Sequence, residues 1–566
     1  MHRTLTLAII LLSTFAFSQK TPQGLAPTGT VNVLTRQNDN QHTGQNLQET
    51  ILTPTNVNSG SFGKVFSYPV DGQVYAEPLY VQNLTMAQGG VHNVVFVATE
   101  YDSIYAFDAD SAASNPNPLW HVNFLNPPTV APVPCSQGSG ICQLFPIVGI
   151  TSTPVINLAT NTIYAVVRTQ ETSGTTVNWV VRVHALDITS GAEKTGSPAT
   201  ICSATGNAGC ALAGGTTPTF GPHHQQSRPG LMLVPEAGFP QGVLVIGFAG
   251  DSGWVLAFDP TSLKLLAAFY TDDEKAHSTK TPGIPGEGHA GIWAAGGAVV
   301  ADTTGNIYAI TGDGFWDGTV NWGDSLVKLV LTFNSTTGTY SLVPADYFTT
   351  SDQACRYAHG LDYGSAGPLI LPPQGGSTPN LIFTTGKQVG TCETSFAGYV
   401  INRDNMGHTG GQVSTMSLPN GGGEQSPAYW STGTTQYIYN GGDADALRAF
   451  TVSSAGVSTS PVLASTHLFD SGTSPEVSAN GTTNGIVWAL ERLDDPDHQP
   501  GFQPAVLHAF NATNLSELYN SSQAASGRDT AGPSVKFQVP MVANGKVYVG
   551  TQTELDVYGL CPCAQK

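Results

Sequence analysis

Polar and aromatic residues gather just before strand-length apolar runs, most of which begin with proline. Histidine and arginine beside carboxylates and an indole can bind a polar ligand or a metal ion, and histidine can act as an acid or base near neutral pH. The strongest candidates lie in the segments 223–228 and 287–293. The alternative is that these side chains only make hydrogen bonds between structural units, since buried polar groups must be paired. The full candidate set is His223, His224, Gln226, Arg228, Glu287, His289, Trp293, Asp362, Tyr363, Glu424, Gln425 and Asp529.

An acidic loop is a second candidate site. Asp313, Asp317 and Asp324 lie in the segment TGDGFWDGTVNWGDS. Loop carboxylates can bind Ca²⁺, although the spacing of an EF-hand is absent. The alternative is a solvated turn.

These residues belong to a repeat that runs along the chain. Three short patterns recur in order: an apolar stretch led by proline, a β-branched and aromatic run, and a run ending in an aromatic residue or Leu followed by Asp or Asn. Gly, Asn, Asp or Ser separate the runs, as expected for strands joined by turns. Repeats of this kind predict an all-β, eight-bladed β-propeller of four-stranded antiparallel blades. The first pattern occurs at Pro78, Pro154, Pro229, Pro368, Pro427, Pro475 and Pro540, with Gly296–Val299 in the corresponding place of the fourth unit.

Proline indicates which strand is innermost. Because proline cannot donate to a ladder, it belongs on an edge strand, and the innermost strand of a blade is an edge. The residues before these strands should therefore converge at one end of a central channel, while Glu77 and Glu476 lie in the inner strands themselves. The segment Phe62–Tyr68 should close the ring as the outer strand of the last blade. The alternative is two stacked domains of four units each.

The composition limits the possible functions. The 566 residues include 21 Lys+Arg and 40 Asp+Glu, with a formal net charge of −19. This balance argues against a nucleic-acid partner, because phosphate binding needs clusters of basic residues. A protein of long helices would be more highly charged. The 64 glycines and 37 prolines fit a turn-rich fold.

The N-terminus predicts export. Leu5–Phe17 is apolar and follows a short basic start, but it is shorter than the roughly 20 residues that span a bilayer. We predict a signal peptide over residues 1–18 with cleavage near Ser18, and a secreted or periplasmic mature chain without a transmembrane segment. The remaining predicted boundaries are an N-terminal extension over 19–60, the propeller over 61–560 and a tail over 561–566.

The eight cysteines fit an oxidising compartment. Zinc binding is the competing interpretation, but the chain has no two Cys-x-x-Cys pairs. The state of Cys561 and Cys563 stays open. The predicted disulfides join Cys135 to Cys142, Cys202 to Cys210 and Cys355 to Cys392.

The repeat units resemble those of a known group. The segments 95–110 (VFVATEYDSIYAFDAD), 119–124 (LWHVNF) and 539–560 (VPMVANGKVYVGTQTELDVYGL) are similar to PQQ-binding-like β-propeller repeats of the quinoprotein alcohol dehydrogenase-like group, which includes exported bacterial members. The resemblance implies PQQ and Ca²⁺ as cofactors. The dehydrogenases of this group hold the quinone between a tryptophan and a disulfide of adjacent cysteines. The present chain has no adjacent Cys pair, and Gly63-Lys64, Gly386-Lys387 and Gly545-Lys546 have no tryptophan close behind them.

Three hypotheses for function follow. The first is a binding protein that takes a protein, a glycan or a small polar ligand at the central funnel or the propeller face. The second is a PQQ- and Ca²⁺-dependent dehydrogenase of an alcohol or sugar with an altered site. The third is a scaffold of the cell envelope. No catalytic residue can be assigned from the sequence.

Overall fold

The protein consists almost entirely of β-strands. The structure is a computed structural model, and it describes residues 31–110, 116–135, 144, 146–212, 218–250, 252–272, 290–294, 297–387, 392, 398–418, 423–493, 503–561 and 563. In this part of the chain, one α-helix and three 3-10 turns accompany the strands: α1 (Gln353–His359), η1 (Arg36–Asn38), η5 (Tyr363–Ser365) and η6 (Ala525–Gly527). None of the described helices is long and apolar enough to cross a membrane. The predicted all-β class is confirmed.

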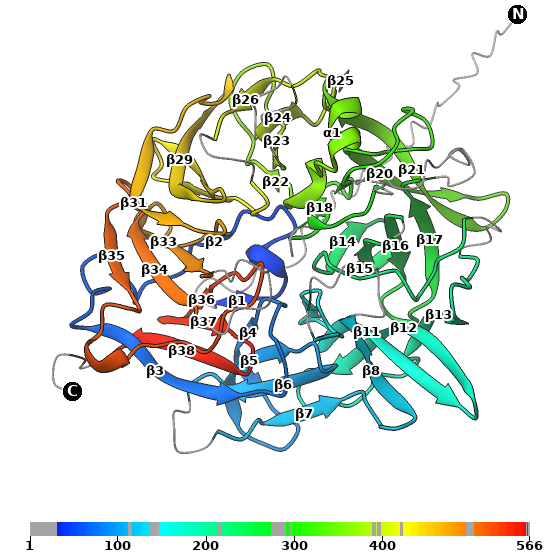
Figure 1. Cartoon of the computed structure of the whole chain (residues 1–566), viewed down its shortest axis with the longest axis horizontal. Coiled ribbons are helices and arrows are strands. Elements are labelled where there is room, and N and C mark those ends of the chain that lie inside the picture. Colours follow the sequence, from blue (N-terminus) through cyan, green and yellow to red (C-terminus); the bar gives the residue numbers. More distant parts are fainter. Residues whose placement is uncertain are drawn as a thin grey trace, which may run out of the picture.

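The described strands form eight sheets, and Figure 1 shows them arranged around a common centre. We number them in chain order. Sheet 1 contains β4 (Leu79–Thr85), β5 (Val91–Ala98), β6 (Ser103–Asp108) and β7 (Trp120–Asn123). Sheet 2 contains β10 (Val155–Asn157), β11 (Thr162–Ser173), β12 (Thr176–Asp187), β13 (Ala199–Thr205), β8 (Val130–Pro134) and β9 (Ile147–Val148). Sheet 3 contains β14 (Met232–Glu236), β15 (Phe239–Phe248), β16 (Trp254–Phe258) and β17 (Leu265–Tyr270).

The next three sheets have the same plan. Sheet 4 contains β18 (Val300–Ala301), β19 (Ile307–Ile310), β20 (Ser325–Asn334), β21 (Thr339–Thr349) and β25 (His408–Thr409). Sheet 5 contains β22 (Leu369–Ile370), β23 (Leu381–Thr385), β24 (Gly398–Asn402) and β26 (Ser414–Met416). Sheet 6 contains β27 (Ala428–Ser431), β28 (Gln436–Gly441), β29 (Asp445–Ser453), β30 (Gly456–Val457) and β31 (Leu463–Phe469).

The last two sheets also bind strands from the start of the chain. Sheet 7 contains β32 (Glu476–Asn480), β33 (Thr483–Glu491), β34 (Val506–Asn511) and β35 (Glu517–Asn520), with β2 (Gln45–Asn46). Sheet 8 contains β36 (Met541–Ala543), β37 (Lys546–Gly550), β38 (Glu554–Leu560) and β3 (Phe62–Pro69), and β1 (Asn32–Val33) joins sheet 1. The predicted pairing of the 62–68 segment with the last unit is confirmed, because Tyr68 lies opposite Leu555 and Phe62 opposite Leu560.

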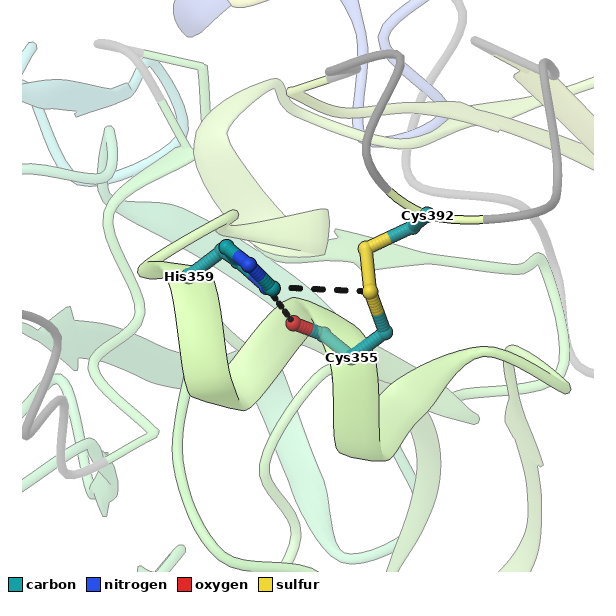
Figure 2. A group of neighbouring side chains, drawn as sticks. All are labelled: Cys355, His359 and Cys392. Atoms are coloured by element: carbon teal, nitrogen blue, oxygen red, sulfur yellow. Dashed lines mark hydrogen bonds between the residues drawn. A yellow bond between two sulfur atoms is a disulfide. The ribbon is translucent and has the colours of Figure 1, made fainter.

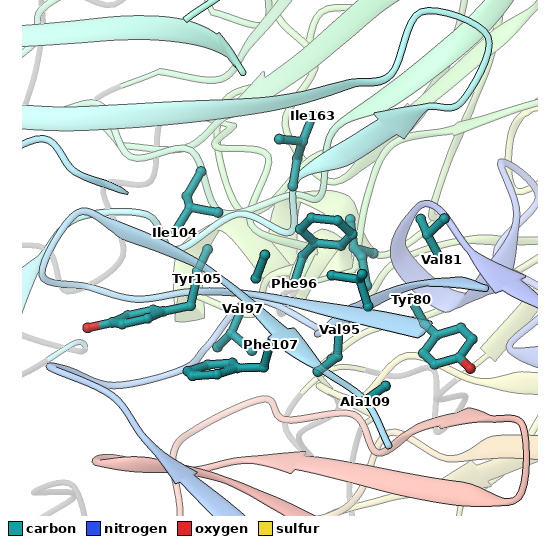
Figure 3. Packing of buried hydrophobic residues seen from close by; sticks show 14 of the residues in the cluster. Tyr80, Val81, Val95, Phe96, Val97, Ile104, Tyr105, Phe107, Ala109 and Ile163 are labelled. Atoms are coloured by element: carbon teal, nitrogen blue, oxygen red, sulfur yellow. The ribbon is translucent and has the colours of Figure 1, made fainter. Parts of the chain in front are cut away.

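The third strands β6 and β16 are buried on both faces because each sheet packs between two neighbours, whereas the outer strand β7 alternates buried and exposed residues. Figure 3 shows Phe96 and Ile104 of sheet 1 on the side of Ile163 from sheet 2, with Val95 and Phe107 on the opposite side. On that opposite side, the ring of Phe107 stacks on Tyr68 of sheet 8 at 4.4 Å between centroids. Aromatic side chains that fill such spaces supply much of the apolar burial.

Substitution of Lys64 on β3 tests how much this N-terminal strand stabilises sheet 8. Lys64 Nζ lies 2.5 Å from Asp556 Oδ1, and Asp556 is fully buried. We expect Lys64→Met to lower the free energy of unfolding by about 2 kcal/mol, because it removes the cation beside a buried carboxyl, which keeps its hydrogen bond from Gly532 N. Urea denaturation followed by tryptophan fluorescence measures this change.

The matched control is Lys546→Met on the same sheet. Its ammonium lies 2.6 Å from Asp110, which is half exposed. A surface pair of this kind contributes less than about 0.5–1 kcal/mol. Equal effects of the two substitutions would show that the β3 contact does not stabilise the fold.

Residues 31–49, which we call the inner segment, run through the middle of the molecule. Figure 1 shows η1 and β1 at the centre of the ring of sheets. The sequence analysis gave this part of the extension no role, whereas the structure bonds it to the first strand of sheet after sheet. These contacts follow chain order. Asn32 pairs with Val81 of sheet 1, Leu34 O accepts from Ile156 N of sheet 2, and Asn40 donates to Leu233 O of sheet 3 and accepts from Ala301 N of sheet 4. In sheets 5 to 8 the contacts are Ile370 N to Gln41 O, Tyr429 N to Thr43 O, Val477 N to Gly44 O, and Asn46 Nδ2 to Val542 O.

Candidate functional site

A buried ionic group lies where the inner segment crosses the centre. Arg36, Glu77 and Glu476 are all at most 2% exposed, and Arg36 Nε lies 3.5 Å from Glu77 Oε2. The inner segment also binds both carboxyls, since Gln37 N donates to Glu77 and Asn38 Nδ2 donates to Glu476 Oε1 at 2.6 Å. The two glutamates that the sequence placed in inner strands therefore meet, but around an arginine that the prediction had not included.

Burial sets the charge of this group. It raises the pKa of Glu77 to about 7, although Arg36 opposes the shift. Burial, and then the neighbouring Glu77, raise the pKa of Glu476 well above its usual range. One proton therefore stays on the pair of carboxyls near neutral pH, and the remaining negative charge balances the guanidinium. Because the group has no exposed surface, we assign it to packing rather than to ligand binding.

A second group, which we call the central polar cluster, consists of residues that precede the first strand or follow the second strand of a sheet. Phe537 precedes β36, Arg228 precedes β14 and Trp293 precedes β18. The Arg228 guanidinium lies 5.8 Å from the Trp293 ring centre and 5.3 Å from that of Phe537. Loops of sheets 3, 4 and 8 thus come together although sheets 3 and 8 are not adjacent in chain order. The complete cluster is Arg228, Trp293, Asp313, Asp362, Lys387, Glu424, Arg492, Lys536 and Phe537.

Asp362 connects this aromatic part to a lysine. A Cβ on Gly312 would meet both Asp362 Oδ1 and the Trp293 ring, so only glycine lets these two side chains approach here. Lys387 Nζ lies 2.6 Å from Asp362 Oδ2 and 3.8 Å from Glu424 Oε1. The Lys387 and Glu424 side chains keep 34% and 24% of their surface exposed, so the cluster can be reached from solvent.

The surroundings shift the pKa values of Asp313 and Asp362 in opposite directions. Burial, and then the charge of Asp362, raise the pKa of Asp313 to about 9. Burial also acts to raise the pKa of Asp362, but Lys387 and hydrogen bonds from Asp313 outweigh it and hold that pKa below its ordinary value. At neutral pH Asp313 is therefore a neutral hydrogen-bond donor and Asp362 is the anion.

Cations gather on the other side of the cluster. Lys536 Nζ lies 4.8 Å above the Phe537 ring. Burial lowers the pKa of Lys536, Glu424 opposes this, and the positive charges of Arg492, Arg228 and Lys387 add to it. Three others of the 21 basic side chains of the chain therefore act on the Lys536 ammonium. Glu424 offsets part of this positive charge, and a bound anion would offset more of it.

The structure brings together only part of the predicted candidate set. Arg228, Trp293, Asp362 and Glu424 belong to the central polar cluster, as does Asp313 from the acidic loop. Glu287 and His289 lie outside the described residues. The remaining candidates are His223, His224, Gln226, Tyr363, Gln425 and Asp529.

Those remaining candidates have structural contacts. The His223 and His224 rings lie together at 4.3 Å, beside Trp179 of β12 and Asn207. Gln226 forms a backbone bridge with Ala249. Gln425 Nε2 donates to Ser471 O, which joins sheet 6 to sheet 7.

The two other candidates are also bonded within or between sheets. Tyr363 is fully buried, and its hydroxyl bonds to Thr384. Asp529 lies away from the centre, because it accepts hydrogen bonds from Lys64 N of β3 and from the Tyr519 hydroxyl of β35. Its prediction as a funnel residue is corrected: the long connection to β36 first passes the outer strands.

The acidic loop does not gather its three carboxylates. Asp317 is exposed and accepts hydrogen bonds from the backbone of Thr319, Val320 and Asn321, which lowers its pKa even though partial burial acts to raise it. Asp324 is fully buried and accepts from Tyr363 N. For Asp317, the interpretation as a solvated turn fits the structure better than the predicted metal site.

Lys387, Arg492, Lys536 and Phe537 were missing from the sequence prediction. A signal was present for two of them, because Lys536 and Phe537 stand four and three residues before Pro540, in the same position as the candidates chosen elsewhere. Lys387 follows the second strand of its unit. The prediction for the central channel considered only residues before or within the first strand of each unit, so it could not include this lysine.

Two predicted disulfides are formed, Cys202–Cys210 and Cys355–Cys392. Cys135 is also disulfide-bonded, and its predicted partner Cys142 lies outside the described residues. Cys561 pairs with Cys563. Figure 2 shows His359 of α1 facing the Cys355–Cys392 bond, with its Nδ1 2.9 Å from the Cys355 carbonyl oxygen. Because the sulfurs are bonded to each other, this trio does not offer thiolates to a metal.

Known proteins share the fold of this chain. No protein-family model matches it, and no curated protein matches it. Among solved structures, a europium-containing methanol dehydrogenase has a TM-score of 0.52 at 14% identity, covering 94% of this chain and 98% of that chain. BamB from Moraxella catarrhalis has a TM-score of 0.42 at 10% identity, covering 88% and 99%. The dehydrogenase is a β-propeller protein, so the propeller fold is confirmed; at this identity the likeness concerns the fold alone.

Proposed function

We propose that this chain is an exported β-propeller whose central polar cluster binds a small anionic ligand. We infer that each of the eight sheets is one blade and that β3 closes the ring in the last of them. The observation that supports ligand binding is that the positive charges of Arg228, Lys387 and Arg492 all act on Lys536 in a chain that carries a net charge of −19. Disulfides between strands and loops support an oxidising compartment.

The arrangement suits a carboxylate or phosphate group. Lysine ammonium and arginine guanidinium groups bind such anions by charge-assisted hydrogen bonds. The half-buried rings of Trp293 and Phe537 supply apolar walls beside the charges. A few convergent polar groups among aromatic side chains are typical of small-molecule sites.

The cluster does not fit the calcium–quinone pair that the family resemblance implies. Calcium prefers carboxylate oxygens, but Asp362 already binds the ammonium of Lys387 at 2.6 Å and Asp313 retains its proton. The adjacent cysteines that hold the quinone in the dehydrogenases are also absent from the sequence. We therefore derive no oxidation step. The scaffold hypothesis stays a prediction.

Calorimetric titration of the full chain at low ionic strength tests anion binding. The ligands are inorganic phosphate, citrate and PQQ, with glucose as a neutral comparison. We expect at least one anion to bind saturably and glucose not to bind. Lys536→Met should weaken anion binding about 10-fold or more, because a charge-assisted hydrogen bond contributes roughly 1.5–3 kcal/mol.

The control is Lys546→Met, which removes one positive charge from the surface of sheet 8 and should leave the affinity unchanged. Raising the salt concentration should weaken binding, since exposed charges are screened. The proposal is wrong if none of the three anions binds, if glucose binds equally well, or if the two lysine variants behave alike.

A further inference from the structure

Two histidines and a glutamate meet where sheet 6 packs against sheet 7. His467 comes from β31, Glu491 ends β33 and His508 lies in β34. His467 Nε2 lies 3.2 Å from Glu491 Oε1, and His508 Nε2 lies 3.4 Å from Glu491 Oε2. One ligand atom from each residue can be chosen so that all three lie within 4.8 Å of one another. The sequence analysis did not single out this group.

We propose that His467, Glu491 and His508 bind a divalent transition-metal ion of the zinc class. Imidazole nitrogens and a carboxylate oxygen form the three-residue sets of many zinc sites, with water as a fourth ligand. Neighbouring ligand atoms of a tetrahedral ion with bonds of about 2.0–2.1 Å lie roughly 3.3–3.4 Å apart. The two nitrogen–oxygen separations, 3.2 Å to one oxygen of Glu491 and 3.4 Å to the other, are close to this spacing.

Glu517 orients one of the ligands. Its Oε1 lies 2.7 Å from His508 Nδ1, so the Nδ1–H group donates a hydrogen bond to this carboxylate. Nε2 then faces Glu491. A carboxylate behind a metal-binding histidine fixes the ring in this way in known sites. Glu517 is therefore a positioning residue rather than a ligand.

The contacts at Nε2 are poor hydrogen bonds. The 3.4 Å separation between His508 and Glu491 exceeds the usual range of 2.7–3.2 Å. His467 Nε2 is buried, and its 3.2 Å contact with Glu491 Oε1 lacks the directionality of a hydrogen bond. Each of the two nitrogens thus faces one oxygen of the Glu491 carboxylate.

Strands hold the group in place. The rings of His467 and His508 stack at 4.3 Å, and Phe469 packs at 5.3 Å from His508. His508 is 1% exposed and Glu491 is 8% exposed, whereas the His467 side chain keeps 31% of its surface, which leaves an entry path for an ion. Because the ligands belong to two sheets, the ion would tie these sheets together and stabilise the folded chain by mass action.

Calorimetric titration of the full chain, purified without a histidine tag, with Zn²⁺ tests the site. We expect one ion per chain, a rise in melting temperature with added Zn²⁺, and for Co²⁺ the visible absorption of a tetrahedral complex. His467→Ala should weaken Zn²⁺ binding about 100-fold or more, and Glu517→Gln about 10- to 100-fold with a changed Co²⁺ spectrum. His467→Gln replaces His467→Ala if that variant does not fold.

His408→Ala is the matched control. His408 also faces a carboxylate, since its Nε2 lies 3.4 Å from Asp346, but no second histidine joins it in the described structure. This variant should bind Zn²⁺ like the original chain. The proposal is wrong if the original chain binds no Zn²⁺ at micromolar concentrations, or if both His467 variants bind it unchanged; the group is then a buried hydrogen-bond network only.

Discussion

Replacing Arg36 by alanine should lower the free energy of unfolding by about 3–5 kcal/mol at pH 7. The substitution removes a fully buried cation that lies 3.5 Å from Glu77 and faces Glu476. Removing one partner of a buried ion pair costs this much because the other charge stays behind without compensation. The lost side-chain volume adds a cavity. Urea denaturation monitored by tryptophan fluorescence gives the value.

Two further variants separate charge from packing. Arg36→Met combined with Glu77→Gln removes both charges and keeps the volumes, so it should recover most of the loss. Glu476→Gln should change stability by less than about 1 kcal/mol, because this carboxyl already retains its proton and Asn38 Nδ2 can still donate to its oxygen. A value for Arg36→Ala within about 1 kcal/mol of the original chain would show that the buried pair does not stabilise the fold.

Glu100→Gln should change how stability depends on pH. Glu100 is fully buried after β5 and accepts hydrogen bonds from Gly149 N at 2.6 Å and the Thr151 hydroxyl at 3.1 Å. Burial raises its pKa to about 7, with these hydrogen bonds and the charges of Arg228 and Arg168 opposing the shift. In the unfolded chain the value returns to about 4.3.

Proton binding decides whether the stability of the original chain rises or falls with pH. Between about pH 4.5 and 7 the folded state holds a proton that the unfolded state has released, so stability falls as the pH rises through this range. A difference of about 2.5 in pKa corresponds to about 3 kcal/mol. Glu100→Gln cannot release a proton. Relative to the original chain, it should therefore gain about 3 kcal/mol between pH 4.5 and pH 8.

Denaturation curves at several pH values test this gain in stability. The control is Glu171→Gln, whose stability should change with pH in the opposite direction. Glu171 pairs with Arg182, and the hydrogen bond from that guanidinium lowers its pKa. Its stabilising effect is present above the unfolded pKa and disappears in acid, so Glu171→Gln should lose stability at neutral pH only. Parallel pH profiles for the original chain and Glu100→Gln would contradict the prediction.

The repeat could be predicted from the sequence because it depends on local patterns. Proline stands directly before β4, β10, β22, β27, β32 and β36, as the rule for edge strands requires. Arg228, Trp293, Asp362 and Glu424 of the central polar cluster followed from the same rule. The rule failed at Asp529, because a long connection need not approach the centre along its whole length.

Other features could not be predicted. The inner segment binds chiefly through backbone groups and short polar side chains, so it carries no alternation of apolar residues that would mark a strand. The pairing of Arg36 with Glu77 joins residues whose proximity depends on the whole ring. His467 and His508 meet only because two sheets pack with a particular offset, and a single sequence contains no signal for that offset.

The inner segment has a consequence for how the chain folds. It precedes all eight sheets in the chain, and its bonds to the sheets follow the order of those sheets in the sequence. Each new sheet can therefore dock onto a template that is already present, and the length of that template limits how many sheets fit around it. β3 behaves differently, since its partner β38 is the last of the described strands. The N-terminal residues can therefore order the sheets one after another as the chain folds, whereas the pairing of β3 needs the last strand and completes the fold.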